Sequence, residues 1–239
     1  MIRSLTLAGL LAAAAPASAQ DWSAQLTPYV WATGLGGQLT PRAGGPSLSF
    51  DRSFSEVMED SDAAFFLSGF ARRDRLVVMG DLSWSSSSRD GHLGNGLPAE
   101  GELTQRSLTL AAGYRALQDR DRTLDLLVGM RAWRVEADVS VANGVVRASH
   151  TENFIDPILA ARAHFTLAPR WSALIYLDCG GFGVGSENTS QVVTTVNYQV
   201  NDRLFISGGY RRLDMDYRSG GTRLDVVMQG PLLGVTWTF

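Results

Sequence analysis

Apolar and polar residues alternate with a period of two over most of the chain after residue 20, and this pattern predicts β-strands. In residues 122–137, for example, the series Leu124, Leu126, Val128 and Met130 alternates with Asp125, Leu127, Gly129 and Arg131. Successive side chains of a strand point to opposite faces, so these strands have two faces in different environments. The longest unbroken apolar runs after residue 20, at 63–67 and 173–177, are too short for a transmembrane helix.

The segments with this alternation number about ten, and eight is the alternative if one hairpin is divided wrongly. We expect strands near 22–34, 63–72, 75–86, 102–117, 122–137, 150–168, 170–183, 191–201, 203–216 and 223–239. Tight polar turns occupy 72–75, 118–122, 168–170 and 201–203, whereas longer loops rich in Ser, Gly and Asn occupy 36–62, 86–101, 138–149, 184–190 and 216–223. Short turns at one end and long loops at the other are typical of outer-membrane β-barrels.

The two faces of the predicted strands differ in composition, and this difference indicates which face is outside. One face is mostly aliphatic with aromatic residues near the strand ends, whereas the other combines Gly and Ala with regularly placed Asp and Arg. Small residues suit a crowded lumen, and aromatic borders suit the lipid interfaces. We therefore expect an all-β fold, a transmembrane antiparallel up-and-down β-barrel, closed so that no backbone group stays unpaired in hydrocarbon. Pro157 lacks a backbone donor and predicts a local irregularity.

The first 19 residues have the features of a secretory signal peptide. Arg3 gives a positive start, residues 5–15 form a short apolar core, and Ala17-Ser18-Ala19 is a small-residue cleavage pattern. We expect residues 1–19 to be removed on export through the periplasm, and residues 20–239 to form one barrel domain in the bacterial outer membrane.

Composition narrows the functional classes. The chain is 45% hydrophobic and 19% charged, which is unlike a disordered protein, and its net charge of −3 gives no basic face for nucleic acid. The single cysteine, Cys179, excludes an intramolecular disulfide, and the three widely spaced His residues give no metal-ligand pattern. We expect neither a metal nor another cofactor. Cys179 alternates with Leu177 and Ile175 and should face lipid.

The segments TPYVWA (27–32), SFSEVM (53–58), GGFG (180–183), GYRRLD (209–214) and GPLLG (230–234) resemble those of a group of uncharacterised, small porin-like outer-membrane β-barrels of Gram-negative bacteria. The resemblance extends along essentially the whole chain after the leader and implies the fold but no activity. Arg212 stands where the group's pattern has an aromatic residue, which questions the register of 210–216, and a bulge there is one explanation.

The end of the chain carries a second resemblance. Leu233, Val235, Trp237 and Phe239 share one face of the last predicted strand, and this face resembles the C-terminal signal that barrel-insertion machinery recognises. The implied partners are therefore outer-membrane lipid and that machinery.

Charged residues on the predicted inner face are the main candidates for function. They are Asp81, Arg115, Asp125, Arg131, Asp156, Arg162, Asp178 and Arg211, with His164 nearby. In one interpretation they pair and fill the interior, because the Arg fork binds carboxylates and a barrel of eight to ten strands has little free lumen. In the other they form a charged constriction that admits small polar solutes with weak ion selectivity. An adhesive or ligand-binding surface on the long loops is the alternative function.

Two further features bear on function. Residues 51–60 have the pattern of a short helix capped by Ser53, with Glu56 three residues later, which would pack on the rim or plug the barrel mouth. We assign no catalytic residue, because His92 and His150 lack a matching nucleophile and the pair Asp214 and Asp216 fits a solvated strand tip better than an active site. We therefore predict a non-enzymatic barrel, with an outer-membrane lipid hydrolase as the least favoured alternative.

Overall fold

The structure, a computed structural model, describes residues 22–40, 48–52, 61–92, 98–141, 146–219 and 221–239. Its elements are all strands: β1 (Ser23–Trp31), β2 (Gly34–Thr40), β3 (Leu48–Arg52), β4 (Ser61–Arg73), β5 (Leu76–His92), β6 (Pro98–Gln118), β7 (Arg122–Val141), β8 (Val146–Ala168), β9 (Trp171–Gly181), β10 (Asn188–Gln199), β11 (Leu204–Ser219) and β12 (Thr222–Thr238). In this part of the chain, no helix is long and apolar enough to cross a membrane.

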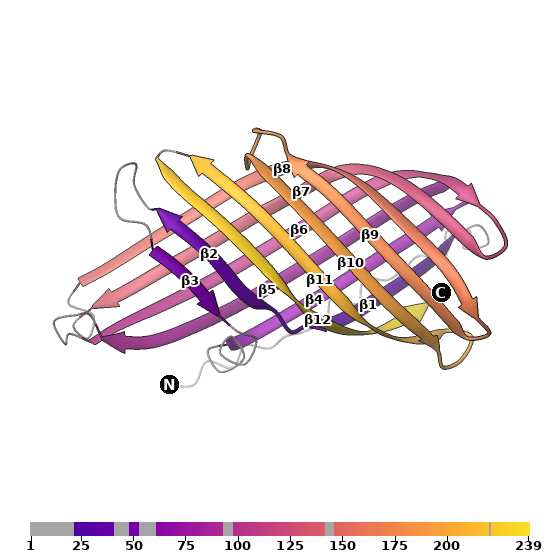
Figure 1. Cartoon of the computed structure of the whole chain (residues 1–239), viewed down its shortest axis with the longest axis horizontal. Coiled ribbons are helices and arrows are strands. Elements are labelled where there is room, and N and C mark those ends of the chain that lie inside the picture. Colours follow the sequence, from indigo (N-terminus) through magenta and orange to yellow (C-terminus); the bar gives the residue numbers. More distant parts are fainter. Residues whose placement is uncertain (1–21, 41–47, 53–60, 93–97, 142–145, 220) are drawn as a thin grey trace, which may run out of the picture.

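Ten of these strands form a closed antiparallel barrel, which confirms the predicted fold class and strand number. β4 to β12 follow one another around the wall, and β1 pairs with both β4 and β12 (Figure 1). The closing seam runs to the last residue, because the backbone N–H of Phe239 donates to the carbonyl of Ala24 over 2.9 Å. Closure leaves no free edge within the ring, as a barrel in hydrocarbon requires.

The tight turns lie together at one end of the barrel, which we call the turn end. Asp74-Arg75 and Pro169-Arg170 are two-residue turns, and Asp74 and Arg170 adopt positive φ angles of 52° and 68°. β1 begins and β12 ends at this same end, on the right in Figure 1. We call the opposite end the hairpin end.

The long loops at the hairpin end were predicted at the right places but are too long. β5 continues to His92, β6 starts at Pro98, and β7 and β8 pair out to Val141 and Val146. The predicted loop 36–62 likewise contains most of β2 and all of β3. These strand extensions lie beyond the apolar outer surface and have few hydrophobic residues, so the alternation that marks a strand in the sequence is lost.

β2 continues the line of β1 along the same partner strand. β1 pairs with the second half of β12 and β2 with its first half, in one unbroken register from Leu26↔Trp237 to Thr40↔Arg223. Only Ala32 and Thr33 interrupt the two strands. Gly230 of β12 is needed there, because a Cβ at this position would lie 1.9 Å from the carbonyl oxygen of Ala32. The β2–β3 hairpin thereby extends the wall without entering the ring of ten.

Three local predictions need correction or lie outside the described residues. The expected helix 51–60 is wrong at its start, since Asp51 and Arg52 belong to β3, and 53–60 lie outside the described residues, as does the leader 1–19. The register of β11 runs without a shift past Arg212 on both sides, so the suggested bulge is wrong. Pro157 causes no register shift, since β8 pairs with β7 without interruption there, and it lies just beyond the first pair of β8 with β9, Ile158↔Gly180.

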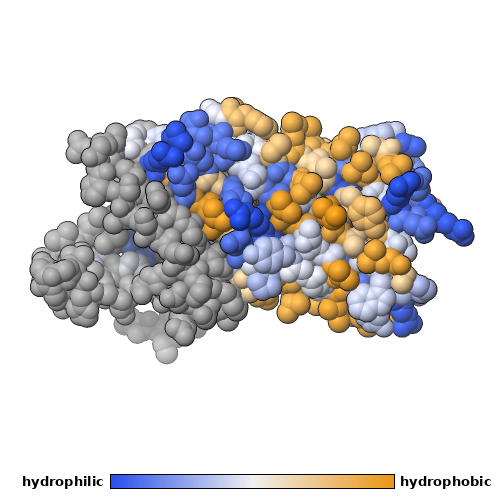
Figure 2. Space-filling model, viewed as in Figure 1, coloured by the Kyte–Doolittle hydropathy of each residue, from blue (hydrophilic) through white to orange (hydrophobic). Residues whose placement is uncertain are grey.

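The outer surface carries a continuous apolar belt around the middle of the ring. Its residues include Leu108, Leu110, Val128, Leu159 and Leu233, each between 42% and 68% exposed. Figure 2 shows exposed hydrophobic side chains on one face of the barrel. Tyr114, Trp171 and Trp237, each about half exposed, lie at the border of the belt near the turn end. Cys179 is exposed on the same outer face. Exposed apolar side chains over a closed wall are what a lipid environment stabilises.

The belt predicts a position-dependent effect of charge. Leu110→Arg, in the middle of the belt on β6, should lower the free energy of unfolding in lipid vesicles by about 2–4 kcal/mol, because the guanidinium enters hydrocarbon. The same substitution at Thr104, on the same face beyond Arg106, is the control and should cost little. Equal effects at both positions would contradict the assignment of the belt.

Candidate functional site

The structure places all nine predicted charged residues on the inner wall of the barrel. Seven are buried, and the other two, Asp81 and His164, are half-buried and line an internal cavity. Strand alternation explains this placement, since each residue shares its face with small or buried neighbours such as Thr109, Ala111 and Ala160. The residues do not form one array but three ion-paired groups, together with one aspartate held by neutral donors.

The first group lies near the turn end and joins two arginines to one aspartate. Arg115 donates to Asp125 through Nε (2.7 Å) and Nη2 (3.2 Å), a two-bond contact that suits the planar guanidinium. Arg162 reaches the same carboxylate only through Nη1, over 3.4 Å, and its guanidinium stacks on Phe70 at 4.0 Å from the ring centre. Asp125 is fully buried between them. The group therefore holds two positive charges against one negative charge.

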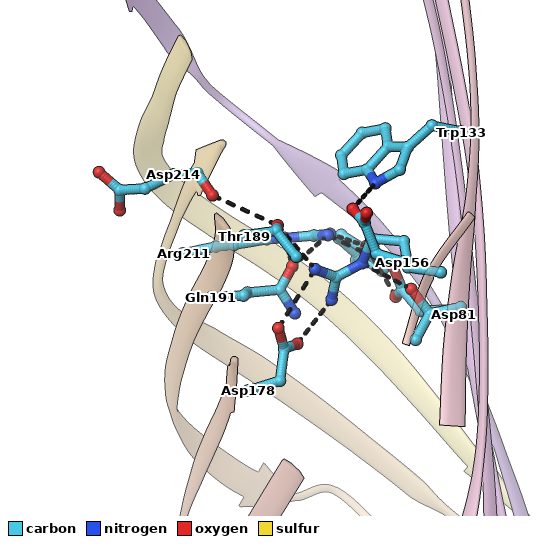
Figure 3. Close-up of polar contacts among 11 residues, drawn as sticks. Asp81, Trp133, Asp156, Asp178, Thr189, Gln191, Arg211 and Asp214 are labelled. Carbon is cyan, nitrogen blue, oxygen red and sulfur yellow. Dashed lines mark hydrogen bonds and ion pairs between the residues drawn. The ribbon is translucent and has the colours of Figure 1, made fainter. Parts of the chain in front are cut away.

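The second group crosses the middle of the lumen. Arg131 donates through Nη2 to Asp178 over 2.5 Å and through Nη1 over 3.2 Å, and its Nε donates to Thr109 over 2.9 Å. Thr189, which Arg131 also contacts, donates in turn to the backbone carbonyl of Asp214 (Figure 3). This arrangement connects β7 to β9, β10 and β11 across the interior.

The third group connects β11 to β1, β5 and β10. Arg211 donates to Gln191 over 2.7 and 3.1 Å, lies 3.4 Å from Asp81, and donates to the hydroxyl of Tyr29. That hydroxyl donates over 2.9 Å to Asp81. Sequence reasoning identified Arg211 and Asp81 but missed Tyr29 and Gln191, although strand alternation places both of them on the inner face.

Asp156 differs from the other aspartates because neutral groups hold it. The indole N–H of Trp133 donates to it over 3.1 Å, and the backbone N–H of Ser186 donates over 2.6 Å (Figure 3). Ser186 belongs to the short connection between β9 and β10, so this aspartate fastens that connection over the wall.

An apolar cluster that the sequence did not reveal fills the lumen toward the hairpin end. It consists of buried Trp31, Phe66, Trp133, Leu213, Met215, Val226, Met228 and Leu232. Beyond it, Phe154 of β8 stacks on Tyr217 of β11 with ring centres 4.4 Å apart, and Tyr217 donates to Glu152 over 2.8 Å. We call these residues together the aromatic cluster: the eight buried apolar residues, Phe154 and Tyr217, with Glu152 as the hydrogen-bond partner of Tyr217. The sequence pattern did not predict these inward aromatic residues, because each lies on a strand face that also carries charged residues.

Toward the turn end, part of the lumen is open. A cavity of about 220 Å³ extends from Gln25 and Thr238, beside the turns, to Tyr29 and Arg211 in the middle of the barrel. The structure therefore shows a lumen that is filled at its middle and at the aromatic cluster and hollow at the turn end.

The residues considered for catalysis do not converge on a site. Asp214 and Asp216 lie on the outer face of β11, where Asp214 accepts from Arg212 over 2.6 Å and Asp216 from Arg218 over 2.8 Å. The side chain of His150 lies outside the described residues, while its backbone belongs to β8. Among the described residues, no group of three or more His, Cys, Asp or Glu side chains is placed to hold a metal ion.

The shared carboxylate predicts a large loss of stability when it is removed. Asp125→Ala leaves the Arg115 and Arg162 guanidiniums buried without a counter-charge and should cost about 3–5 kcal/mol of unfolding free energy. Asp214→Ala is the control, since its half-exposed ion pair with Arg212 should contribute less than about 1 kcal/mol. Denaturant unfolding in vesicles, followed by tryptophan fluorescence, measures both. Equal losses of unfolding free energy in the two variants would mean that the buried ion pairs stabilise the barrel no more than the half-exposed pair does.

Comparison with known proteins supports the fold. Neither a protein-family model nor a curated protein sequence matches the chain. The outer membrane protease OmpT from Escherichia coli has a similar structure, with a TM-score of 0.62 and 10% identity over 93% of this chain and 98% of that one. The transport unit of the autotransporter AIDA-I from Escherichia coli (TM-score 0.45, 11% identity, 99% and 94% coverage) and Ail of Yersinia pestis (0.39, 13%, 92% and 99%) are more distant matches. At these identities the likeness concerns the fold alone: this chain has the fold of a Gram-negative outer-membrane β-barrel.

Proposed function

We propose that the protein is a non-enzymatic structural barrel of the bacterial outer membrane, with a lumen closed to solutes. In this proposal the turn end, where β1 begins and β12 ends, faces the periplasm, and the hairpin end faces outward. This orientation is general for outer-membrane barrels. The main support for this proposal is that side chains fill the cross-section of the barrel. The Arg131–Asp178 contact and the Arg211 group cross the middle, and the aromatic cluster fills the space toward the hairpin end.

A conducting pore of the kind considered from the sequence needs a continuous water-filled path. The aromatic cluster opposes such a path, because its eight apolar residues from Trp31 to Leu232 are each at most 8% exposed and the partly buried Phe154 packs against them. The buried ion pairs oppose it too, since moving them apart would leave charges unpaired in a low-dielectric interior. The paired Arg and Asp residues in the middle of the lumen therefore have a structural role in this proposal, since Arg131 joins β7 to β9 and Arg211 joins β11 to β5.

The closed lumen predicts the absence of channel activity. Protein refolded in detergent and added to planar lipid bilayers should give no resolvable conductance steps. To assign any steps that occur, a Cys179→Ser, Gln191→Cys variant provides a thiol only on the inner wall. Steps that a thiol-reactive cation blocks in this variant, but not in Cys179→Ser alone, would show conduction through this lumen and overturn the proposal.

A second function, binding at the outer surface, is favoured by one observation. β5 to β8 extend past the ends of β9 and β10 toward the hairpin end (Figure 1), and β8 pairs only with β7 over residues 146–157. Its other edge therefore carries backbone groups that lack strand partners in the described pairings. An exposed strand edge of this kind can accept an added strand of a partner.

The two functions separate experimentally. Replacing the extensions of β7 and β8, residues 136–151, with a two-residue Asn-Gly turn shortens the hairpin without touching the ring. We expect the shortened barrel to insert and resist unfolding like the parent chain, because Arg131, Asp156 and Trp133 remain. A parallel loss of attachment of expressing cells to surfaces would support the binding function, whereas unchanged attachment would exclude this hairpin from it.

The non-enzymatic part of the proposal rests on the outward direction of Asp214 and Asp216 and on their pairing with arginines. Incubation of refolded protein with peptide, phospholipid and lipid A should give no turnover. Turnover that disappears in Asp214→Ala or His150→Ala protein would establish an enzyme instead.

A further inference from the structure

Among the described residues, the turn end of the lumen holds more positive than negative charge. Arg115 uses two nitrogens on Asp125, whereas Arg162 has a single 3.4 Å contact to the same carboxylate. The middle groups differ, because Arg131 pairs with Asp178 and Arg211 with Asp81, one for one. A guanidinium has five N–H donors, so Arg162 retains donors that Asp125 does not occupy.

These donors lie between two cavities. A second cavity, of about 200 Å³, is lined by Arg72, Arg115 and Arg162 and by His164, and among the described residues no acidic side chain lines it. It shares Gln25, Phe70, Arg162 and His164 with the larger cavity, so the two adjoin along these residues. Part of the positive charge of the first group therefore borders the open space of these cavities.

The larger cavity provides a different environment beyond this charged wall. Its apolar lining includes Phe70, Met79, Leu174, Val193, Phe205 and Leu232. Hydroxyl groups of Ser68, Ser172 and Thr195 are interspersed among them. At about 220 Å³ it is smaller than the ~300–1,000 Å³ of sites for drug-sized molecules, so its occupant must be small.

We infer that the turn end of the lumen binds a small organic carboxylate. The carboxylate accepts hydrogen bonds from the free donors of Arg162, with His164 and the Arg115 guanidinium beside it, and the apolar body enters the larger cavity past Phe70. Such a ligand supplies the negative charge that the Arg115–Asp125–Arg162 group lacks, at a site where low dielectric strengthens ion pairing. The arrangement resembles general small-molecule sites, which combine an apolar lining with a few convergent polar groups.

The test uses two probes of nearly equal shape that differ in charge. Binding of 4-fluorobenzoate and of 4-fluorobenzyl alcohol to the full refolded barrel is followed by fluorine NMR, with empty micelles as the blank. We expect saturable binding of the carboxylate and at least tenfold weaker binding of the alcohol. Equal binding of both probes would overturn the proposal, as would no binding above the blank. Inorganic phosphate is the competitor, and displacement at equal concentration would show a simple anion site and overturn the assigned ligand class.

Matched variants locate the site. Arg162→Gln removes the shared wall donor while leaving Arg115 and Asp125 paired, so the barrel should fold, as heat-modifiable gel migration checks. Arg122→Gln removes an arginine at the same end that pairs with Asp119 and lines neither cavity. We expect at least tenfold weaker carboxylate binding in Arg162→Gln and less than a twofold change in Arg122→Gln. Equal losses in both variants, or none in either, would overturn the proposal.

A third variant keeps the test decisive if Arg162→Gln does not fold. Val193→Phe narrows the larger cavity without changing any charge. It should weaken binding of 4-fluorobenzoate but leave a small carboxylate such as acetate unaffected as a competitor. Unchanged binding of 4-fluorobenzoate would show that the larger cavity does not receive the apolar body and would overturn the proposal.

Discussion

The backbone pairing between the first and last strands is the constraint on which the rest of the structure depends. In hydrocarbon each unpaired N–H or C=O costs several kcal/mol, so a sheet with a free edge is not viable there. Here β1 and β12 close the ring, and the bond from Phe239 to Ala24 extends closure to the final residue. Once the ring is closed with ten strands, its lumen is narrow enough for side chains from opposite walls to meet.

Opposite walls meet through unlike pairs rather than through a uniform core. Near the hairpin end the contacts are apolar and aromatic, and in the middle they are balanced ion pairs, whereas near the turn end Arg115, Asp125 and Arg162 join only the neighbouring strands β6, β7 and β8. A buried charge pair is weak evidence for net stability, but removal of one partner is costly. The inner residues thus fix the positions of distant strands relative to one another in the middle of the lumen and at the aromatic cluster. The hollow turn end lies outside these contacts.

The sequence predicts the ring well because the lipid-facing residues repeat at a period of two. Ten strands, their turns and the inward direction of all nine charged residues follow from that period. It does not predict partners across the lumen: Arg131 contacts Asp178, 47 residues away, while Asp156 accepts from Trp133 and Ser186. Nor does it reveal strands such as β2 and β3, whose faces do not alternate once the chain leaves the apolar belt.

The shared register of β1 and β2 along β12 has a consequence for biogenesis. β12 comes last in chain order among the described strands, yet it contacts β11, β1 and β2. A chain that lacks the 17 residues of β12 therefore cannot close the ring, and β2 has no strand in the ring to pair with. Termination before Thr222 exposes the edges of β11 and β1 at once, and quality control then meets an open sheet rather than a shortened barrel.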